Sequence, residues 1–567
     1  MQKPWIQRFP IEACDSHLAR SVFLLLLAVF TATFNGLPGG IDGEVSFQST
    51  SALARTGSCA LSQTPESQGL IAEAESRPAG GFSVRGVGEA EERKHYGWFG
   101  IGMTISGLPF YALGRGMSLM STGTQEKHRE YTRFGTTRSE YYEHLFVGWR
   151  NGLLTALTAC LLVLSARRLG VSRSAAFMGG MGYGLCTFAL PQARGWFADV
   201  QGAFCMSAAF YSFLLLRDDW TAKRCTLLGA SLAFAFLTRS SLAPAVLVFN
   251  LAFLWLYRAT PGAFAKPGEG TTRTRSLLHW ALPQVAALGL WMLANQLRFG
   301  HPLDSGYGQA LSGGLFGGDP RTSVAGLLIS PGKGLLWMAP GLLLLVFGVR
   351  RAVEEHELHL VWILGLASLA IFLPAAALVG WHGAWSFGPR YLLPALPLLW
   401  ILAVLGFQQS PIEPSMRVSA WALLALGLMI QLPGTLVDTV TYHDLAVRAS
   451  TERFEDLGLD EAATLADLQE ARFSAMQFDW GFAGPWAQWR ILRHRVALSS
   501  EDFPVREIFR FPSDLVLRPS QPREMGFRHM AWVDLRERLD GNIWLVVALI
   551  TLLVLWGTAD ASRGLDP

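Results

Sequence analysis

The stretch "SVFLLLLAVFTATFNGLPGGIDGE", Ser21–Glu44, joins a long apolar run to two acids. Its first part, Ser21–Phe34, has no ionisable side chain and follows Arg20, so in isolation it is typical of a signal peptide. Similar apolar runs recur along the chain, and we therefore expect it to be retained as the first membrane-spanning helix. Asp42 and Glu44 then stand directly at its exit from the membrane.

The composition supports an integral membrane protein with many spans. Of 567 residues, 51% are hydrophobic and only 16% are charged, and 20 are Trp. The net charge of +3 and the lack of a basic run argue against a nucleic-acid partner. The six Cys show no paired spacing, so neither a disulfide framework nor a thiolate metal site is expected.

We predict an all-α polytopic fold. A bilayer core takes roughly 20 apolar residues as helix, and on that basis the chain has about twelve crossings. The pair interrupted by "TRSSLAP" can also be read as one bent hairpin. The expected spans are Ser21–Phe34, Trp149–Ser165, Ala175–Leu190, Val200–Leu216, Thr226–Leu237, Leu242–Tyr257, Trp280–Leu297, Leu335–Val349, Leu360–Val379, Tyr391–Phe407, Ala420–Leu436 and Ile543–Trp556.

Lys and Arg concentrate in the short loops on the side of the N-terminus, which predicts a cytoplasmic N-terminus. Two long segments, 37–148 and 437–541, then lie outside the cytoplasm. The first carries "YGWFGIGMTISGLPFYALGRG", Tyr96–Gly116, which is typical of a helix lying in the membrane interface. We expect a transmembrane module over 1–436, an outer region without a core of its own over 437–541, and a last helix with a short cytoplasmic tail over 542–567.

Polar residues that interrupt the apolar sequence share the outer side. Each alone has a plainer explanation, because charged side chains near helix ends commonly extend to the interface and Trp anchors helices there. Together they offer a carboxylate to accept a proton and cations to stabilise a phosphate, which transfer from a lipid-phosphate carrier to a hydroxyl requires. These residues are Asp42, Glu44, Asp199, Arg239, Tyr307, Lys333, His382 and Arg390.

Several motifs together resemble a family. They are "IDGE", the Tyr96–Gly116 element, "GYGLCTFALPQARGWFAD", "GASLAFAFLTRSSLAP", "RFGHPLDSGYG", "SPGKGLLWMAP" and "WHGAWSFGPRYLLPALP". In order and side they resemble the GT-C type glycosyltransferases that use polyprenyl-phosphate sugars, in the protein O-mannosyltransferase and aminoarabinose transferase branch called family 39. The lengthened first outer loop, around Ser58 to Arg93, and the segment after Gln409 depart from that pattern.

The resemblance implies a GT-C-like bundle and an inverting sugar transfer with Asp42 as the general base. Glu44 would orient the acceptor, and Asp199 would be a second acidic residue of the site. Arg390, with Lys333 or Arg239, would hold the carrier phosphate, and His382 and Tyr307 would complete the substrate-binding set. The donor would be a polyprenyl-phosphate-linked sugar, the acceptor a lipid, glycan or protein, and the location a bacterial inner membrane with the site facing the periplasm or exterior.

A divalent cation, Mg or Mn, stays open, because some GT-C enzymes bind one through loop carboxylates. Asp42 and Glu44 would share a face in an extended loop and diverge in a helix. Hard cations usually take more oxygen ligands than these acids supply, so we assign no metal ligand. Two other classes also stay open: a transporter or flippase of lipid-linked or small anionic substrates, and a non-catalytic membrane scaffold.

Overall fold

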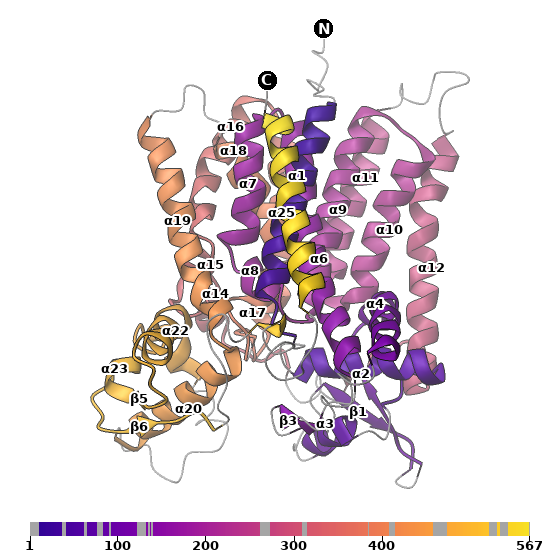
Figure 1. Cartoon of the computed structure of the whole chain (residues 1–567). Helices are drawn as coiled ribbons and strands as arrows, with labels where there is room; N and C mark the ends of the chain where they lie inside the picture. The colour runs from indigo at the N-terminus through magenta and orange to yellow at the C-terminus, as the bar shows by residue number, and fades with distance from the viewer. Residues whose placement is uncertain are drawn as a thin grey trace.

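The computed structural model of the protein describes residues 11–36, 41–61, 65–75, 83–89, 92–121, 132–133, 136–137, 140–260, 273–308, 315–383, 385–407, 414–456, 473–520, 530–532 and 543–565. A bundle of roughly parallel and antiparallel helices fills one part of the molecule, and shorter elements gather at one end of it (Figure 1). The described part of the chain begins and ends at the opposite end of the bundle (Figure 1).

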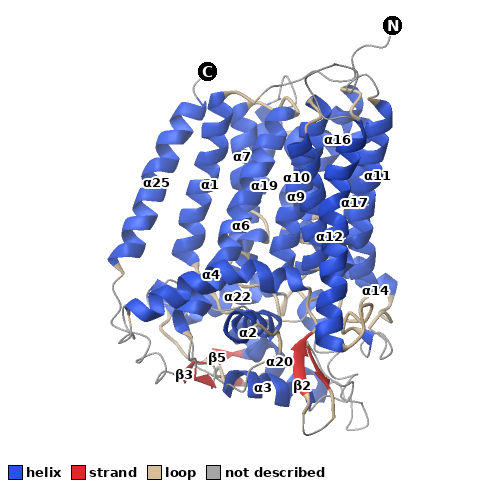
Figure 2. Ribbon diagram, turned by 90° about the vertical axis from the view of Figure 1, so that its right-hand side faces the viewer, coloured by secondary structure: helices blue, strands red, loops and turns tan. Residues whose placement is uncertain are grey.

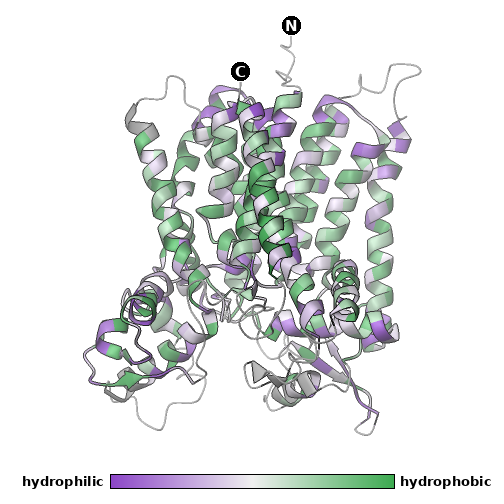
Figure 3. Ribbon diagram, in the orientation of Figure 1, coloured by the Kyte–Doolittle hydropathy of each residue, from purple (hydrophilic) through white to green (hydrophobic). Residues whose placement is uncertain are grey.

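Within the described residues, eight helices are long and apolar enough to cross a membrane, which makes the chain an integral membrane protein. Apolar residues cover the middle of the bundle and polar ones collect toward its ends (Figure 3). The helices are α1 (Ala13–Thr33), α6 (Tyr141–Arg168), α9 (Ala198–Asp218), α11 (Ala243–Ala259) with the preceding turn η1 (Ser240–Leu242), α12 (Arg273–Phe299), α17 (Leu358–Ala377), α19 (Pro414–Leu436) and α25 (Trp544–Leu565).

The other four expected spans fall on shorter or interrupted helices of the same bundle. Proline and glycine shorten them: η3 (Pro340–Leu344) precedes α16, and η4 (Arg390–Leu392) and Pro394 precede α18. The segment "TRSSLAP" joins two separate helices through η1, so the single bent hairpin is excluded. The shorter helices are α7 (Arg173–Leu185), α8 (Ala189–Gln192), α10 (Ala222–Thr238), α15 (Leu335–Met338), α16 (Leu345–Glu354) and α18 (Leu396–Gly406).

Small residues let bundle helices approach closely, as is usual when lipid supplies no hydrophobic force between them. At Gly229 of α10, an added Cβ would stand 2.1 Å from the backbone oxygen of Trp280 in α12. The first and last helices, α1 and α25, also pack together, and Asp560 of α25 accepts a hydrogen bond from Arg20 of α1. The last helix is therefore an integral part of the bundle.

The end of the bundle away from the termini is called here the outer end, after the predicted orientation. The first long segment forms α2 (Ile41–Thr56), α3 (Pro65–Glu75), the antiparallel pair β1 (Val84–Val87) and β2 (Lys94–Gly97), α4 (Ile101–Met120), and the antiparallel pair β3 (Thr132–Arg133) and β4 (Thr136–Thr137). Helices α2 and α4 lie across the bundle axis (Figures 1 and 2). The expected interfacial helix is thus present as α4, although it begins at Ile101 because Tyr96 and Gly97 belong to β2.

Two acidic residues at the start of α6 hold α2 and α4 against the bundle. Glu140 accepts hydrogen bonds from Tyr111 of α4 at 2.6 Å and from Ser51 of α2 at 3.0 Å. Glu143 accepts one from Ser118 of α4 at 2.8 Å. The side chains that place α2 are therefore buried and hydrogen-bonded, which fixes the helix that carries Asp42.

Between α12 and α15 the chain forms the short helix α14 (Pro320–Ile329). The second long segment forms α20 (Thr439–Asp456), α22 (Gly484–Leu492), α23 (Val505–Phe509), and the antiparallel pair β5 (Phe503–Pro504) and β6 (Val516–Leu517). The expectation that this region has no core of its own is wrong. Val437, Leu445, Phe482, Ile491 and Phe509 belong to a separate buried cluster there. The aromatic and aliphatic residues that make this core are scattered over the segment without a regular period, so no pattern in the sequence revealed it.

Candidate active site

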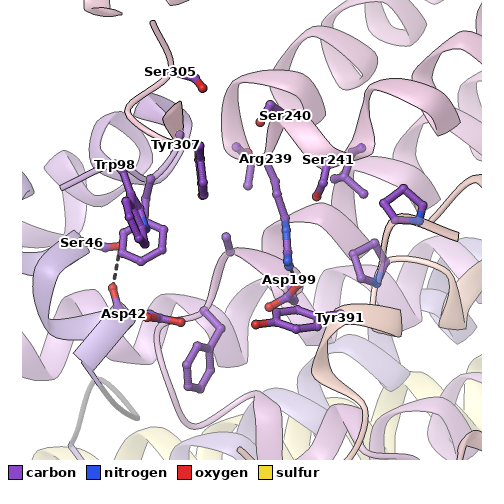
Figure 4. A pocket seen from close by; sticks show the side chains of 18 of the residues that line it. Asp42, Ser46, Trp98, Asp199, Arg239, Ser240, Ser241, Ser305, Tyr307 and Tyr391 are labelled. Carbon is purple, nitrogen blue, oxygen red and sulfur yellow. Dashed lines mark hydrogen bonds and ion pairs between the residues drawn. The ribbon is translucent and has the colours of Figure 1, made fainter. Parts of the chain in front are cut away.

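A cavity of about 370 Å³ opens at the outer end, where α2, α9, α10, α12 and the loops before α14 and α18 meet (Figure 4). Its wall contains both polar and apolar side chains. Five of the eight predicted site residues line it, namely Asp42, Asp199, Arg239, Tyr307 and Arg390. Apolar lining residues include Phe236, Leu242, Trp291, Leu315, Phe316, Ile371 and Leu378.

Asp42 stands in the first turn of α2 and points into the cavity. Its carboxylate accepts a hydrogen bond from Ser83 at 2.9 Å and pairs with the guanidinium of Arg390 at 2.7 Å. The Arg390 side chain is buried, whereas the Asp42 side chain is about one-fifth exposed. Asp42 can therefore be reached from the cavity while its orientation is fixed by two partners.

Glu44 points elsewhere. Because 41–56 is helical, side chains two residues apart diverge by about 200° around the axis. Glu44 accepts a hydrogen bond from Gln48 at 2.8 Å and lies 3.0 Å from Nε2 of His144 in α6, and it is not among the lining residues. The predicted acid pair is thus split: Asp42 belongs to the cavity, and Glu44 belongs to the contact between α2 and α6.

Asp199 and Arg239 form a second ion pair in the wall. Asp199 is buried in the first turn of α9. Arg239 directly follows the last residue of α10, and its guanidinium donates a hydrogen bond to the Asp199 carboxylate. The Tyr391 ring contacts two of the lining cations, with its centroid 4.7 Å from the Arg239 guanidinium and 5.0 Å from that of Arg390. A negatively charged group in the cavity would therefore meet two guanidinium groups held on one aromatic ring.

The pKa values of Arg239 and Arg390 shift in opposite directions. Burial lowers the pKa of Arg239. Burial also acts against the charge of Arg390, but Tyr391 and Asp42 outweigh it and raise the Arg390 pKa above its ordinary value. Arginine stays protonated in proteins at neutral pH, so each side chain carries a positive charge into the cavity.

Trp98 and Arg298 also line the cavity, and the sequence prediction assigned neither of them to the site. Tyr307 stacks on Trp98, with ring centroids 5.2 Å apart and planes at 19°, and burial raises the Tyr307 pKa to about 12. Arg298 of α12 lines the cavity and donates to the carbonyl oxygens of Gly97 and Phe99. Trp98 stands inside the Tyr96–Gly116 motif, so its place beside an expected interfacial element was the signal that could have found it.

Lys333 and His382 lie outside this cavity. Lys333 is buried, donates to the backbone oxygen of Ser386, and lines a separate hollow of about 20 Å³ beside the core of the second outer segment. Burial, and then the charge of Arg390, lower the Lys333 pKa to about 7. His382 stacks on Phe473 at 4.5 Å, and burial lowers its pKa to about 3. Lys333 and His382 therefore lie at the same end of the bundle as Asp42 but do not belong to its cavity.

The carboxylates do not fit a hard divalent cation. In the described part of the chain, no group of three His, Cys, Asp or Glu side chains could hold a metal ion. Asp42 bonds to Arg390, Asp199 bonds to Arg239, and Glu44 faces His144. Because the two carboxylates of the cavity already pair with guanidinium groups, they do not supply the several oxygen ligands that a hard cation takes.

No protein-family model and no curated protein matches the chain. Among solved structures, it is similar to ArnT from Cupriavidus metallidurans in the apo state, at 15% identity and a TM-score of 0.42, over 95% of this chain and 76% of that one. It is also similar to that ArnT bound to undecaprenyl phosphate, at 14% identity and a TM-score of 0.37, over 96% and 76% of the two chains. The archaeal oligosaccharyltransferase AglB from Archaeoglobus fulgidus, in complex with an inhibitory peptide and a dolichol-phosphate, is similar at 11% identity and a TM-score of 0.39, over 79% and 60%. At these values the likeness identifies neither a reaction nor a ligand for this chain.

Proposed function

We propose that the protein is a membrane glycosyltransferase, which moves a sugar from a polyprenyl-phosphate carrier to an acceptor hydroxyl in the cavity at its outer end. One observation carries the proposal: a partly exposed carboxylate, Asp42, shares a cavity with Arg239 and Arg390, and apolar side chains such as Phe236, Trp291 and Ile371 also line that cavity. Few ligands need a proton acceptor, phosphate-binding cations and an apolar wall at once. A lipid-phosphate sugar with an incoming hydroxyl does.

The reaction follows from these positions. The acceptor oxygen attacks the anomeric carbon of the sugar from the face opposite the phosphate, which inverts that carbon. As the new carbon–oxygen bond forms, the bond from the sugar to the phosphate oxygen breaks and its electron pair stays on the phosphate. Asp42 takes the acceptor proton. Arg390 and Arg239 stabilise the charge that develops on the departing phosphate.

Asp42 must exchange partners for this step. In the structure its carboxylate bonds to Arg390, and we infer that a bound phosphate takes over that guanidinium and leaves the carboxylate free to accept a proton. Asp199 would then keep Arg239 in place as the second cation. Glu44 would support the reaction only by holding α2 against α6 through His144.

The outer end would face the periplasm or exterior of a bacterial inner membrane, which the bias of Lys and Arg toward the loops at the other end supports. A transporter or flippase is the alternative. Transporters usually place ionisable groups near the membrane midplane, whereas both ion pairs of this cavity lie at helix ends. Asp199–Arg239 joins the first turn of α9 to the end of α10, and Asp42–Arg390 joins the first turn of α2 to the turn before α18. A scaffold without chemistry would not need the partly exposed carboxylate.

Asp42→Asn tests the proposal in membranes supplied with a labelled polyprenyl-phosphate sugar and an extract of envelope acceptors. We expect transfer to fall by about 10²- to 10⁴-fold, because a general base contributes about that much. Asp319→Asn is the matched control, since Asp319 is exposed at the start of α14, outside the cavity. Undiminished transfer by an Asp42→Asn protein that unfolds at the same temperature as the wild type would remove Asp42 from the role of base.

A further inference from the structure

Arg150 of α6 is a buried cation without an acidic partner. It is 1% exposed, and in the part of the chain that the structure describes it forms no ion pair. Its guanidinium donates to neutral groups: to Ser106 and Gln201, and to Asn151 Oδ1 at 3.1 Å. An unbalanced charge inside a membrane bundle is costly and is usually retained for function.

Arg150 lies directly behind the wall of the cavity. Its guanidinium carbon is 5.6 Å from the ring centroid of Trp196, which lines the cavity. Gln201, which accepts from Arg150, donates in turn to Thr238, another lining residue. At Trp196 one side chain therefore separates the Arg150 charge from the cavity, and in this buried place little water screens it.

The net charge of the lining residues is smaller than the charge of the phosphate that the proposed reaction releases. Asp42 and Asp199 balance Arg390 and Arg239, so Arg298 leaves the lining with one positive charge in excess. The proposed donor is a phosphodiester with a single negative charge, which this excess matches. The carrier that remains after transfer is a phosphate monoester, which carries close to two negative charges at neutral pH.

We propose that Arg150 is a positioning residue that supplies the second positive charge, and that it makes the site favour the doubly charged monophosphate over the singly charged diester. The inference rests on the proposed function. Charge that develops during bond breaking is stabilised by a cation already in place, and an interaction stronger in the transition state than in the bound donor accelerates the step. Arg150 acts through its field and does not touch the phosphate.

The test compares two lipids that differ by one charge, undecaprenyl monophosphate and its methyl phosphodiester, bound to the purified full chain in detergent at pH 8. In Arg150→Gln, we expect monophosphate affinity to fall by about tenfold and diester affinity to change by less than about threefold. Arg150→Lys keeps the charge and should retain the wild-type ratio of the two affinities. Gln201→Glu keeps the Arg150 guanidinium but places a carboxylate beside it. We expect this variant also to lose about tenfold in monophosphate affinity, so it tests the inference if Arg150→Gln does not fold.

Phosphorus NMR gives a readout that a purely structural role would not change. The pKa of the bound monophosphate should rise by about one unit in Arg150→Gln or Gln201→Glu, since the same tenfold preference is then lost. An unchanged affinity ratio and phosphate pKa in both variants would overturn the inference alone. Wild-type protein that binds neither lipid would overturn the proposed function and this inference with it.

Discussion

Asp42 and Arg390 stand 348 residues apart in the chain, yet their side chains form an ion pair at 2.7 Å inside the outer cavity. The pair joins the first turn of α2, just after the first membrane helix, to the turn before α18. It therefore connects the proton acceptor of the proposed reaction to one of its phosphate-binding cations. The same contact gives the first prediction.

Arg390→Ala should weaken use of the lipid-phosphate donor, with KM rising by about 10- to 100-fold, because a charge-assisted hydrogen bond to phosphate contributes about 1.5–3 kcal/mol. Initial rates over a range of donor concentrations measure this change. Arg321→Ala is the control, since Arg321 is an exposed cation of α14 outside the cavity, and its KM should stay at the wild-type value. Equal effects of the two substitutions would contradict the assignment of Arg390.

Trp98→Ala should raise the KM for the donor sugar while leaving the affinity for undecaprenyl monophosphate, which has no sugar, close to that of the wild type. The reason is that the stacked rings of Trp98 and Tyr307 form a flat part of the cavity wall on which a sugar can pack, and neither ring supplies a positive charge for phosphate. Trp98→Phe keeps an aromatic ring and should retain most of the donor affinity. A parallel loss of monophosphate affinity in Trp98→Ala would show that the ring supports the fold and not the sugar.

The sequence predicted that the site residues gather at one end of the helix bundle, because apolar length and loop charge determine how the chain crosses a membrane. It predicted poorly which of them share a cavity. Glu44 leaves the site because residues 41–56 are helical, and Lys333 leaves it because the loop before α15 packs against the second outer segment. Arg150 escaped notice because it stands within an apolar helix, where its partners are not readable from spacing.

The core of the second outer segment was missed for a related reason. Its buried residues come from α20, α22, α23 and the β5–β6 pair, which are short and joined by turns. Each element contributes only a few apolar side chains, so no window of sequence shows a helical or alternating period. Contacts between distant segments, and not local pattern, make this core.

Lys333 should make stability depend on pH above neutrality. Burial, with Arg390, lowers its pKa from 10.5 to about 7, so between these values the unfolded chain binds a proton that the folded chain does not. Stability must then rise with pH across that range, by up to a few kcal/mol, and the contribution is constant below pH 7. Apparent unfolding temperatures in detergent from pH 6.5 to 10 should rise less in Lys333→Met than in the wild type. Lys94→Met, on the exposed hairpin β1–β2, should keep the wild-type slope, and an unchanged slope in Lys333→Met would contradict the prediction.

Gly229→Ala should destabilise the bundle by about 1–3 kcal/mol, because the new Cβ would stand 2.1 Å from the Trp280 oxygen and force α10 and α12 apart. Gly289→Ala in α12 is the matched control, since no atom lies within 4 Å of a Cβ at that position. There the substitution should be neutral or slightly stabilising, as alanine favours helix over glycine. Denaturation in detergent measures both, and equal stabilities of the two variants would show that the close approach of α10 and α12 does not occur. Because Arg239 follows directly after α10, Gly229→Ala should also lower donor affinity, whereas Gly289→Ala should not.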